Sequence, residues 1–320
     1  MNAISHADFP PYELLDGWEL RAADKTRRLE RLYHQTQARS WDPQAMLDEL
    51  EKRHGGIHVP EDKKEALGHV FTVILWGELA AWNIAADLAR QLPDVDAKMA
   101  ATGQVFDEAR HFTVFRDYFA RAKLTLPPVN PFGRRVLRKI LETDSVLEKL
   151  YGMQLLVENL ALAIFKRVAE TNIEPVLTDL LAYIERDESR HVGLGVLYLP
   201  KLLARTTGGE RLHNWAFNME LFLLTIAGGE LLDPHFKVLG IDHRELGATA
   251  QRLHEQVIKQ MAEDAGVPKG QHLRGVYGLT KRQQQAMLDF FHPAAPLKGN
   301  VAKARAIVSR GIHAVAARMA

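Results

Sequence analysis

The stretch DEARH occupies residues 107–111, and a near copy, DESRH, occupies residues 187–191. Both lie in long segments whose apolar residues recur at three- and four-residue intervals, which is the pattern of an amphipathic helix. Each stretch places a glutamate three residues before a histidine. On a helix, that spacing puts the two β-carbons on one face, roughly 5–6 Å apart. Each motif therefore offers one carboxylate oxygen and one imidazole nitrogen to a metal ion.

A single glutamate interrupts the apolar segment that precedes each motif. Glu78 is the glutamate of ILWGELAAW, and Glu158 is the glutamate of LLVENLAL. Ionised carboxylates rarely occupy such surroundings unless they are paired or bound to a metal. Glu78 precedes Glu108 by 30 residues, and Glu158 precedes Glu188 by the same interval. Two helical hairpins of matched length would bring each isolated glutamate level with one motif.

Packed together, the two hairpins predict a four-helix bundle with a metal site in its core. Four carboxylates and two neutral imidazoles balance the charge of two divalent cations. Oxygen and nitrogen donors without sulfur suit iron or manganese, so we expect an Fe/Fe or an Mn/Fe pair. One Glu-x-x-His motif alone would be weak, but the repeat of all six positions is hard to obtain by chance. The predicted metal ligands and catalytic residues are Glu78, Glu108, His111, Glu158, Glu188 and His191.

The aspartate and arginine inside each motif are predicted to support the ligands. A histidine that binds a metal commonly donates its other ring N–H to a carboxylate, which an arginine can hold in turn. We expect Asp187 to lie beside His111, and the symmetry of the hairpins then places Asp107 beside His191. The alternative is that these are solvent-facing helix charges. The supporting residues are Asp107, Arg110, Asp187 and Arg190.

The composition excludes several classes of protein. The 41 basic and 40 acidic residues give a net charge of +1, which offers no field to attract nucleic acid or an anionic membrane. The absence of cysteine excludes disulfides, thiolate zinc sites and iron–sulfur clusters. The first residues lack the pattern of a secretory signal, and the most apolar stretches are too short or too interrupted to span a membrane. We therefore expect a cytoplasmic protein.

The remaining pattern indicates an all-α chain. Four long helices are expected at residues 61–91, 95–123, 145–171 and 174–203. Shorter or peripheral helices are expected at residues 18–40, 44–53, 134–141, 211–232, 244–265, 280–290 and 301–319. We expect one domain over residues 1–320, with N-terminal cap helices at 1–60, a metal-binding core at 61–204 and additional packing helices at 205–320.

The motifs, with FDEARHFTVFR from residue 106 and the SWDP turn from residue 40, resemble the ribonucleotide reductase small-subunit superfamily of ferritin-like proteins. The nearest group is the ligand-binding oxidases related to that subunit. The resemblance covers about residues 61–203. It implies a ferritin-like four-helix bundle with additional N- and C-terminal helices, dioxygen chemistry at a diiron or manganese–iron centre, an apolar ligand tunnel and a homodimer.

Departures from the family patterns narrow the activity. The reductase subunit carries a radical tyrosine where this chain has Phe115, so a reductase role is disfavoured. The ligand-binding oxidases form a Val–Tyr crosslink at positions occupied here by Ala80 and Met153, which cannot form it. Arylamine N-oxygenases carry a third histidine where this chain has Ile184. Rubrerythrins need cysteines, and none is present.

The expected function is a dioxygen-dependent di-metal oxidase or monooxygenase that acts on a small, largely hydrophobic substrate. Without a nucleotide-binding glycine loop or cluster cysteines, electrons would come from a separate ferredoxin or reductase. One alternative is a metal-binding protein for iron handling or oxidant protection. Another is a helical interaction protein whose buried glutamates and histidines pair with one another. The predicted substrate-pocket residues, which are otherwise ordinary core, are Phe112, Phe115, Gln154, Leu162 and Ile184.

Overall fold

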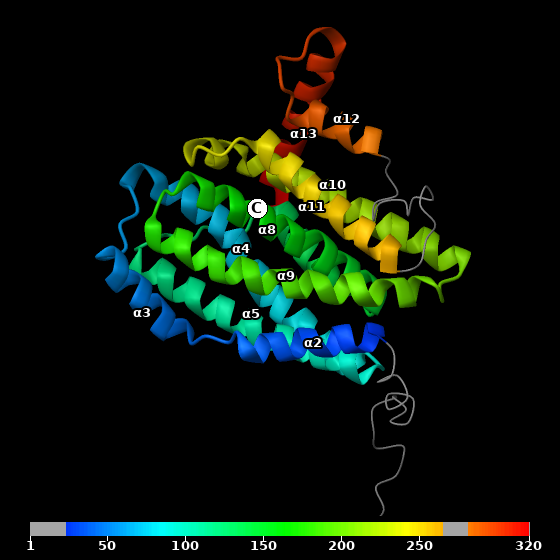
Figure 1. The fold of residues 1–320 in the computed structure, drawn as a ribbon. Helices are drawn as coiled ribbons and strands as arrows, with labels where there is room; N and C mark the ends of the chain where they lie inside the picture. Colours follow the sequence, from blue (N-terminus) through cyan, green and yellow to red (C-terminus); the bar gives the residue numbers. More distant parts are fainter. Residues whose placement is uncertain (1–23, 265–280, 320) are drawn as a thin grey trace, which may run out of the picture.

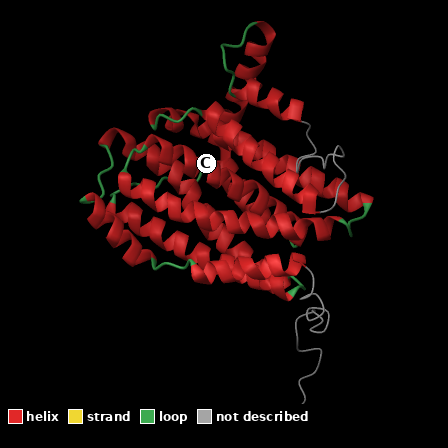
Figure 2. Ribbon diagram, viewed as in Figure 1, coloured by secondary structure: helices red, strands yellow, loops and turns green. Residues whose placement is uncertain are grey.

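The computed structural model describes residues 24–264 and 281–319. These residues form helices and connecting loops with no strand among them (Figures 1 and 2). The predicted all-α architecture is confirmed. Its core is a four-helix bundle of two hairpins that pack against each other. The four helices are α4 (Glu61–Gln91), α5 (Val95–Arg121), α8 (Glu158–Thr171) and α9 (Pro175–Leu203).

Buried carboxylates fix the ends of the bundle helices. Glu174 caps α9 by accepting a hydrogen bond from the backbone N–H of Leu177 at 2.8 Å, and it also accepts from the hydroxyl of Tyr118 on α5 at 3.0 Å. Asp94 stands at the N-cap of α5, but its side chain makes no capping bond. It binds Tyr198 and Lys201 of α9 instead. Both carboxylates therefore join the two hairpins.

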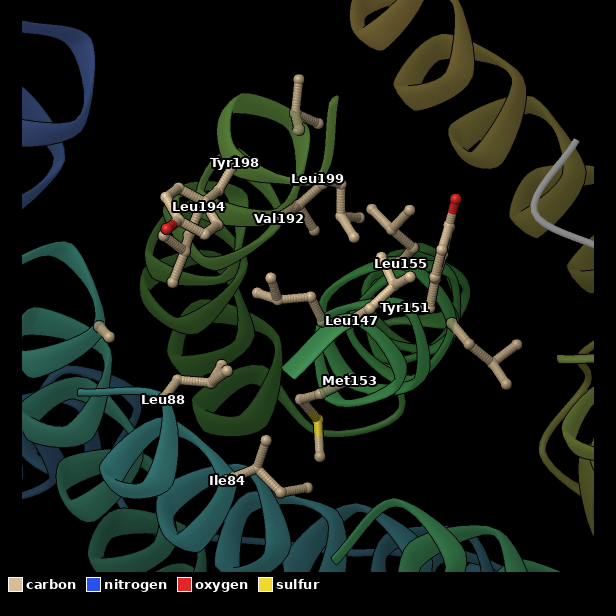
Figure 3. Close-up of a cluster of buried hydrophobic side chains, with 14 of the residues drawn as sticks. Ile84, Leu88, Leu147, Tyr151, Met153, Leu155, Val192, Leu194, Tyr198 and Leu199 are labelled. Carbon is tan, nitrogen blue, oxygen red and sulfur yellow. The ribbon is translucent and has the colours of Figure 1, made fainter. Parts of the chain in front are cut away.

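The helix expected at residues 145–171 is present, but it is not an α-helix over its whole length. It consists of α7 (Val146–Leu150), a π-helical segment η3 (Tyr151–Val157) and then α8, which begins at Glu158. Gly152 permits the close approach of η3 to a neighbouring helix, because a β-carbon there would lie 2.6 Å from Ile140. Figure 3 shows η3 side chains such as Met153 facing those of α4 and α9. The π-helical turn is wider than an α-helical turn, so it changes which side chains of η3 face the core just before Glu158, a predicted ligand.

Peripheral helices surround the bundle (Figure 1). The helices α2 and α3 pack along α5 and α9, α10 packs against α4 and α6, and α11 packs against α8 and α9. The first helix was expected from Trp18, but residues 18–23 lie outside the described residues. The peripheral helices are α2 (Asp24–Ala38), α3 (Pro43–His54), α6 (Pro131–Glu142), α10 (Gly208–Val238), α11 (His243–Asp264), α12 (Lys281–Phe291) and α13 (Gly299–Met319).

Two helices, α4 and α10, are long and apolar enough to cross a membrane by length and composition alone. The most apolar window of α4 is 56% buried inside the protein, and that of α10 is 39% buried. Core helices of water-soluble bundles have the same length and composition. Because α4 carries Glu78 in the bundle core, we assign it to the packed interior.

Candidate metal centre

The six side chains predicted as ligands meet in the bundle core, three from each hairpin. Each is at most 5% exposed. Their ligand atoms form two overlapping groups, and within each group the atoms lie within 4.8 Å of one another. Glu108 and Glu188 belong to both groups, as expected for carboxylates that bridge two metal ions. The groups are Glu78, Glu108, His111 and Glu188, and Glu108, Glu158, Glu188 and His191.

Both histidines direct Nδ1 toward the carboxylates. The Nδ1 atom of His111 lies 3.0 Å from Glu188 and 3.4 Å from Glu78. The Nδ1 atom of His191 lies 2.7 Å from Glu188 and 3.0 Å from Glu108. Nδ1 is therefore the atom that each imidazole offers to a metal.

The opposite ring nitrogens face the supporting aspartates. The Nε2 atom of His111 lies 3.3 Å from Asp187, and that of His191 lies 3.2 Å from Asp107. This is the cross-pairing expected from the symmetry of the hairpins. An aspartate that accepts the Nε2–H bond keeps the proton on that nitrogen and leaves the Nδ1 lone pair for a metal.

Two arginines hold the aspartates in place. Arg110 donates to Asp107 at 2.5 Å and to Asp187 at 2.7 Å, and Arg190 donates to both aspartates at 2.8 Å. All four side chains are at most 5% exposed. The two positive and two negative charges form a closed, neutral network, so the surface-charge alternative does not describe these residues.

Three buried polar atoms test whether the cluster fits a metal cofactor. Glu108 Oε2, His111 Nδ1 and Glu188 Oε1 make no hydrogen bond within the part of the chain that the structure describes. Burying polar atoms without partners is costly. Cations at the centre of the cluster would satisfy these atoms and offset the carboxylate charge. The donor set of carboxylate oxygens and imidazole nitrogens suits iron or manganese, so the residues fit a two-metal cofactor.

In the protein without metal, protons balance these charges. Burial, reinforced by Glu108 and Glu188, raises the pKa of both Glu78 and Glu158. Burial also acts to raise the pKa of Glu108, but the two histidines outweigh it and lower that pKa. Burial acts to lower the pKa of His111, but the surrounding carboxylates raise it well above its usual value. Protons on the outer glutamates and the imidazoles therefore compete with metal ions for the site.

Two polar side chains that the sequence did not predict complete the surroundings. Trp41, in the turn before α3, donates from Nε1 to Asp187 at 2.9 Å and stacks on His111, with ring centroids 6.2 Å apart. Gln104 donates to Glu108 at 2.9 Å and to Glu158 at 3.0 Å. Gln104 lies four residues before Glu108, so helical spacing alone could have identified it.

An apolar cavity of about 270 Å³ borders the cluster at Glu78 and Glu158. It extends between α4, η3, α10, α11 and α12, and its lining also includes Phe291, His243 and His292. None of the five pocket residues predicted from the sequence lines this cavity. Phe115, Gln154 and Ile184 are fully buried in the bundle, and Gln154 donates a hydrogen bond to Gln104 at 3.0 Å. The residues absent from the lining are Phe112, Phe115, Gln154, Leu162 and Ile184.

A family model described as methane/phenol/alkene hydroxylase matches residues 6–204. Among solved structures, a Synechococcus protein with aldehyde deformylating oxidase activity is 18% identical, with a TM-score of 0.55 over 72% of this chain and 97% of that chain. A mutant of the R2-like ligand-binding oxidase with a reconstituted Mn/Fe cofactor is 19% identical, with a TM-score of 0.52 over 74% of this chain and 92% of that chain. Another mutant of that oxidase, with an Fe/Fe cofactor, gives a TM-score of 0.51 at 19% identity over the same shares. No curated protein sequence matches the chain at a significant level.

Proposed function

This chain belongs to the methane/phenol/alkene hydroxylase family, and from that membership we propose that it is a dioxygen-dependent di-metal oxidoreductase that oxidises a small, largely hydrophobic molecule. Its ferritin-like bundle is the fold of the R2-like ligand-binding oxidases. One observation carries the proposal: a buried cluster of four glutamates and two histidines borders an apolar cavity. The cluster can hold metal ions, and the cavity can hold an organic molecule beside them.

We assign each side chain a role in holding the cofactor. Glu78 and His111 would bind one metal ion, Glu158 and His191 the other, and Glu108 and Glu188 would bridge the two. The cofactor is an Fe/Fe or an Mn/Fe pair, the two forms carried by the related oxidase structures. When bound, such a pair supplies the redox chemistry that activates dioxygen.

The protein contributes orientation and exclusion of water. The aspartates fix the direction of each imidazole, so each Nδ1 atom points inward before a metal ion displaces its proton. Gln104 donates to one bridging and one terminal carboxylate and so holds their spacing. The apolar lining keeps water away from a reacting substrate and from reactive intermediates.

The cavity restricts the substrate to small, apolar molecules. Its volume of about 270 Å³ is near the lower end of ligand pockets, which span roughly 300–1,000 Å³. Side chains next to the ligand cluster, such as Ile74, Leu155 and Ala161, are hydrocarbon surfaces. We propose a short hydrocarbon chain or a single aromatic ring as the substrate class. A protein for iron handling would not need this apolar space beside the ligands.

Electrons for the reaction would come from another protein. The chain has no cysteine with which to hold an iron–sulfur cluster. We propose a separate ferredoxin or reductase as the donor, and a cytoplasmic homodimer as the working form.

A matched pair of variants on α8 tests the function. Glu158→Ala removes a proposed ligand, whereas Glu170→Ala changes a glutamate on the same helix whose side chain is 47% exposed. Wild type and Glu170→Ala should each contain about two iron or manganese ions per chain. After anaerobic reduction they should consume dioxygen and oxidise phenol or a short alkene, and Glu158→Ala should do neither. Wild-type protein without bound iron or manganese would disprove the proposal, and iron oxidation without any organic product would favour iron handling.

A further inference from the structure

A second group of side chains that could hold a metal ion lies beside the cavity, whose lining includes two of them, His243 and His292. Asp233 lies on α10, His243 begins α11, and His292 follows α12. One ligand atom from each of the three lies within 4.8 Å of the other two. Because the three residues come from separate elements, the fold and not local sequence brings them together.

The donor atoms face one another. The Nδ1 atom of His243 lies 3.3 Å from Asp233 Oδ1. The rings of His243 and His292 are in contact but tilted, with centroids 3.8 Å apart and planes inclined by 31°. Lys237 binds the other carboxylate oxygen of Asp233 at 2.6 Å, which leaves Oδ1 toward the imidazoles. The Asp233 and His243 side chains are 19% and 11% exposed, so the site is sheltered but open to an ion from solvent.

Neighbouring groups hold this arrangement. Arg244 of α11 donates to the backbone carbonyl of His292 at 2.7 Å, and Arg305 of α13 donates to the carbonyl of Phe291 at 2.8 Å. These bonds fix the chain where it leaves α12. Gly229 leaves space for the His243 ring, since a β-carbon there would lie 3.1 Å from its Nε2 atom. The rest of the fold therefore sets the position of each donor.

We propose that Asp233, His243 and His292 form a mononuclear site for a divalent transition-metal ion, separate from the dinuclear centre. Two imidazoles and one carboxylate are a common ligand set for zinc and for non-haem iron, with open positions left for water. A metal binds such donors at about 2.0–2.2 Å, which places the donor atoms roughly 3–4 Å apart. Small side-chain rotations bring the three donors from their present spacing to that one.

An ion at this position would join α10, α11 and the end of α12. Met287, Leu288 and Phe291 of α12 line the cavity, so the ion would hold that wall against the bundle. The proposal does not depend on the chemistry of the dinuclear centre. A hydrogen bond between Asp233 and His243, together with ring stacking, is the competing explanation.

Zinc stoichiometry distinguishes the two explanations. The full-length protein is loaded with zinc, freed of weakly bound ions by gel filtration, and analysed for zinc per chain. His243→Gln and His292→Gln should each bind one zinc ion fewer than wild type. The control is His235→Gln, which changes an α10 histidine that stacks on His69 outside the cluster, and it should match wild type.

Thermal unfolding provides an independent measurement. Zinc should raise the Tm of wild type and of His235→Gln by more than it raises the Tm of the two cluster variants. Asp233→Asn keeps the side-chain volume and replaces the histidine variants if either fails to fold. Equal zinc content in wild type and in the folded cluster variants would overturn the proposal and leave only the hydrogen-bonded pair.

Discussion

At the scale of single residues, six buried side chains from four helices form the cluster proposed to hold two metal ions, and each histidine is held by an aspartate of the other hairpin. The Glu-x-x-His spacing and the equal intervals between glutamates are properties of the chain, and the structure brings all six side chains together. Trp41 could not be identified in this way. It reaches Asp187 across 146 residues, and no periodicity links a residue in a turn to a carboxylate inside the bundle.

Asp187 offers the sharpest test of the residues around the ligands. It is fully buried and accepts hydrogen bonds from His111, Trp41 and both arginines. In Asp187→Asn, the neutral amide cannot balance the positive charges of Arg110 and Arg190. The amide can also present an N–H group to Nε2 of His111, which would favour the tautomer with its proton on Nδ1. We expect metal affinity to fall about 10- to 100-fold, as measured by competition with a chromogenic chelator.

The matched control for that substitution is Asp179→Asn. Asp179 lies on the same helix, its side chain is 36% exposed, and it pairs with Arg53 and His54 away from the cluster. It should retain wild-type metal affinity. An unchanged affinity in folded Asp187→Asn would show that the aspartate does not orient the ligand.

Burial of His254 predicts a pH dependence of stability. Burial lowers the pKa of His254 to about 4, whereas an unfolded histidine has a pKa of about 6.5. Between these values the unfolded chain binds the proton more tightly, so the free energy of unfolding decreases as pH falls. The loss from this residue between pH 7 and pH 5 should be about 2 kcal/mol.

Urea denaturation of wild type and His254→Gln at both pH values measures this contribution. Between pH 7 and pH 5, the free energy of unfolding of His254→Gln should fall by about 2 kcal/mol less than that of wild type. His313→Gln, which changes an exposed histidine of α13, should behave like wild type. Identical pH dependence in wild type and His254→Gln would refute the assignment.

At the scale of helices, the sequence predicted most elements and missed one deviation. The helix expected at residues 61–91 coincides with α4, and that expected at 174–203 nearly coincides with α9. Apolar periodicity and helix-breaking prolines carry this information. The π-helical segment η3 carries no such signal, because its residues are as apolar as those of an ordinary core helix. The prediction of Gln154 as a pocket residue assumed regular helical facing in this segment, whereas Gln154 is fully buried and donates to Gln104.

Two glycines of α4 test how tightly this helix packs. A β-carbon at Gly68 would lie 2.2 Å from the backbone carbonyl oxygen of Thr125, whereas one at Gly77 would have no atom within 4 Å. Gly68→Ala should therefore force α4 away from the segment after α5 and destabilise the protein by about 1–3 kcal/mol. Gly77→Ala should stabilise it by about 0.5–1 kcal/mol, because alanine favours the helix. Chemical denaturation measures both, and equal effects of the two substitutions would contradict the packing described.

At the scale of the whole molecule, the peripheral helices form the cavity that the bundle alone lacks. The ligand helices supply one wall, whereas α10, α11 and α12 supply the other. Those helices could be predicted as elements from their periodicity. The packing of α10 on α4 and of α11 on α8 could not, because no motif links them to the ligands. α13 has no buried residue and contacts mainly α10, α6 and α12. We propose that these parts form one domain, with the C-terminal helices serving as a cover for the substrate space.

If the cavity holds the substrate, reducing its volume should change selectivity without affecting the cofactor. Ala161 lines the cavity one helical turn after Glu158, so Ala161→Leu adds hydrocarbon next to the cluster without altering a ligand. Metal content should stay at the wild-type value. Hydrophobic pockets discriminate by about 10- to 200-fold per methylene group, so kcat/KM should fall by that order for the larger substrates of an alkene or phenol series and much less for the smallest. Ala304→Leu, on the exposed surface of α13, should leave both quantities unchanged. Because the substitution and its control add the same atoms, equal selectivity in Ala161→Leu and wild type would mean that oxidation takes place outside this cavity.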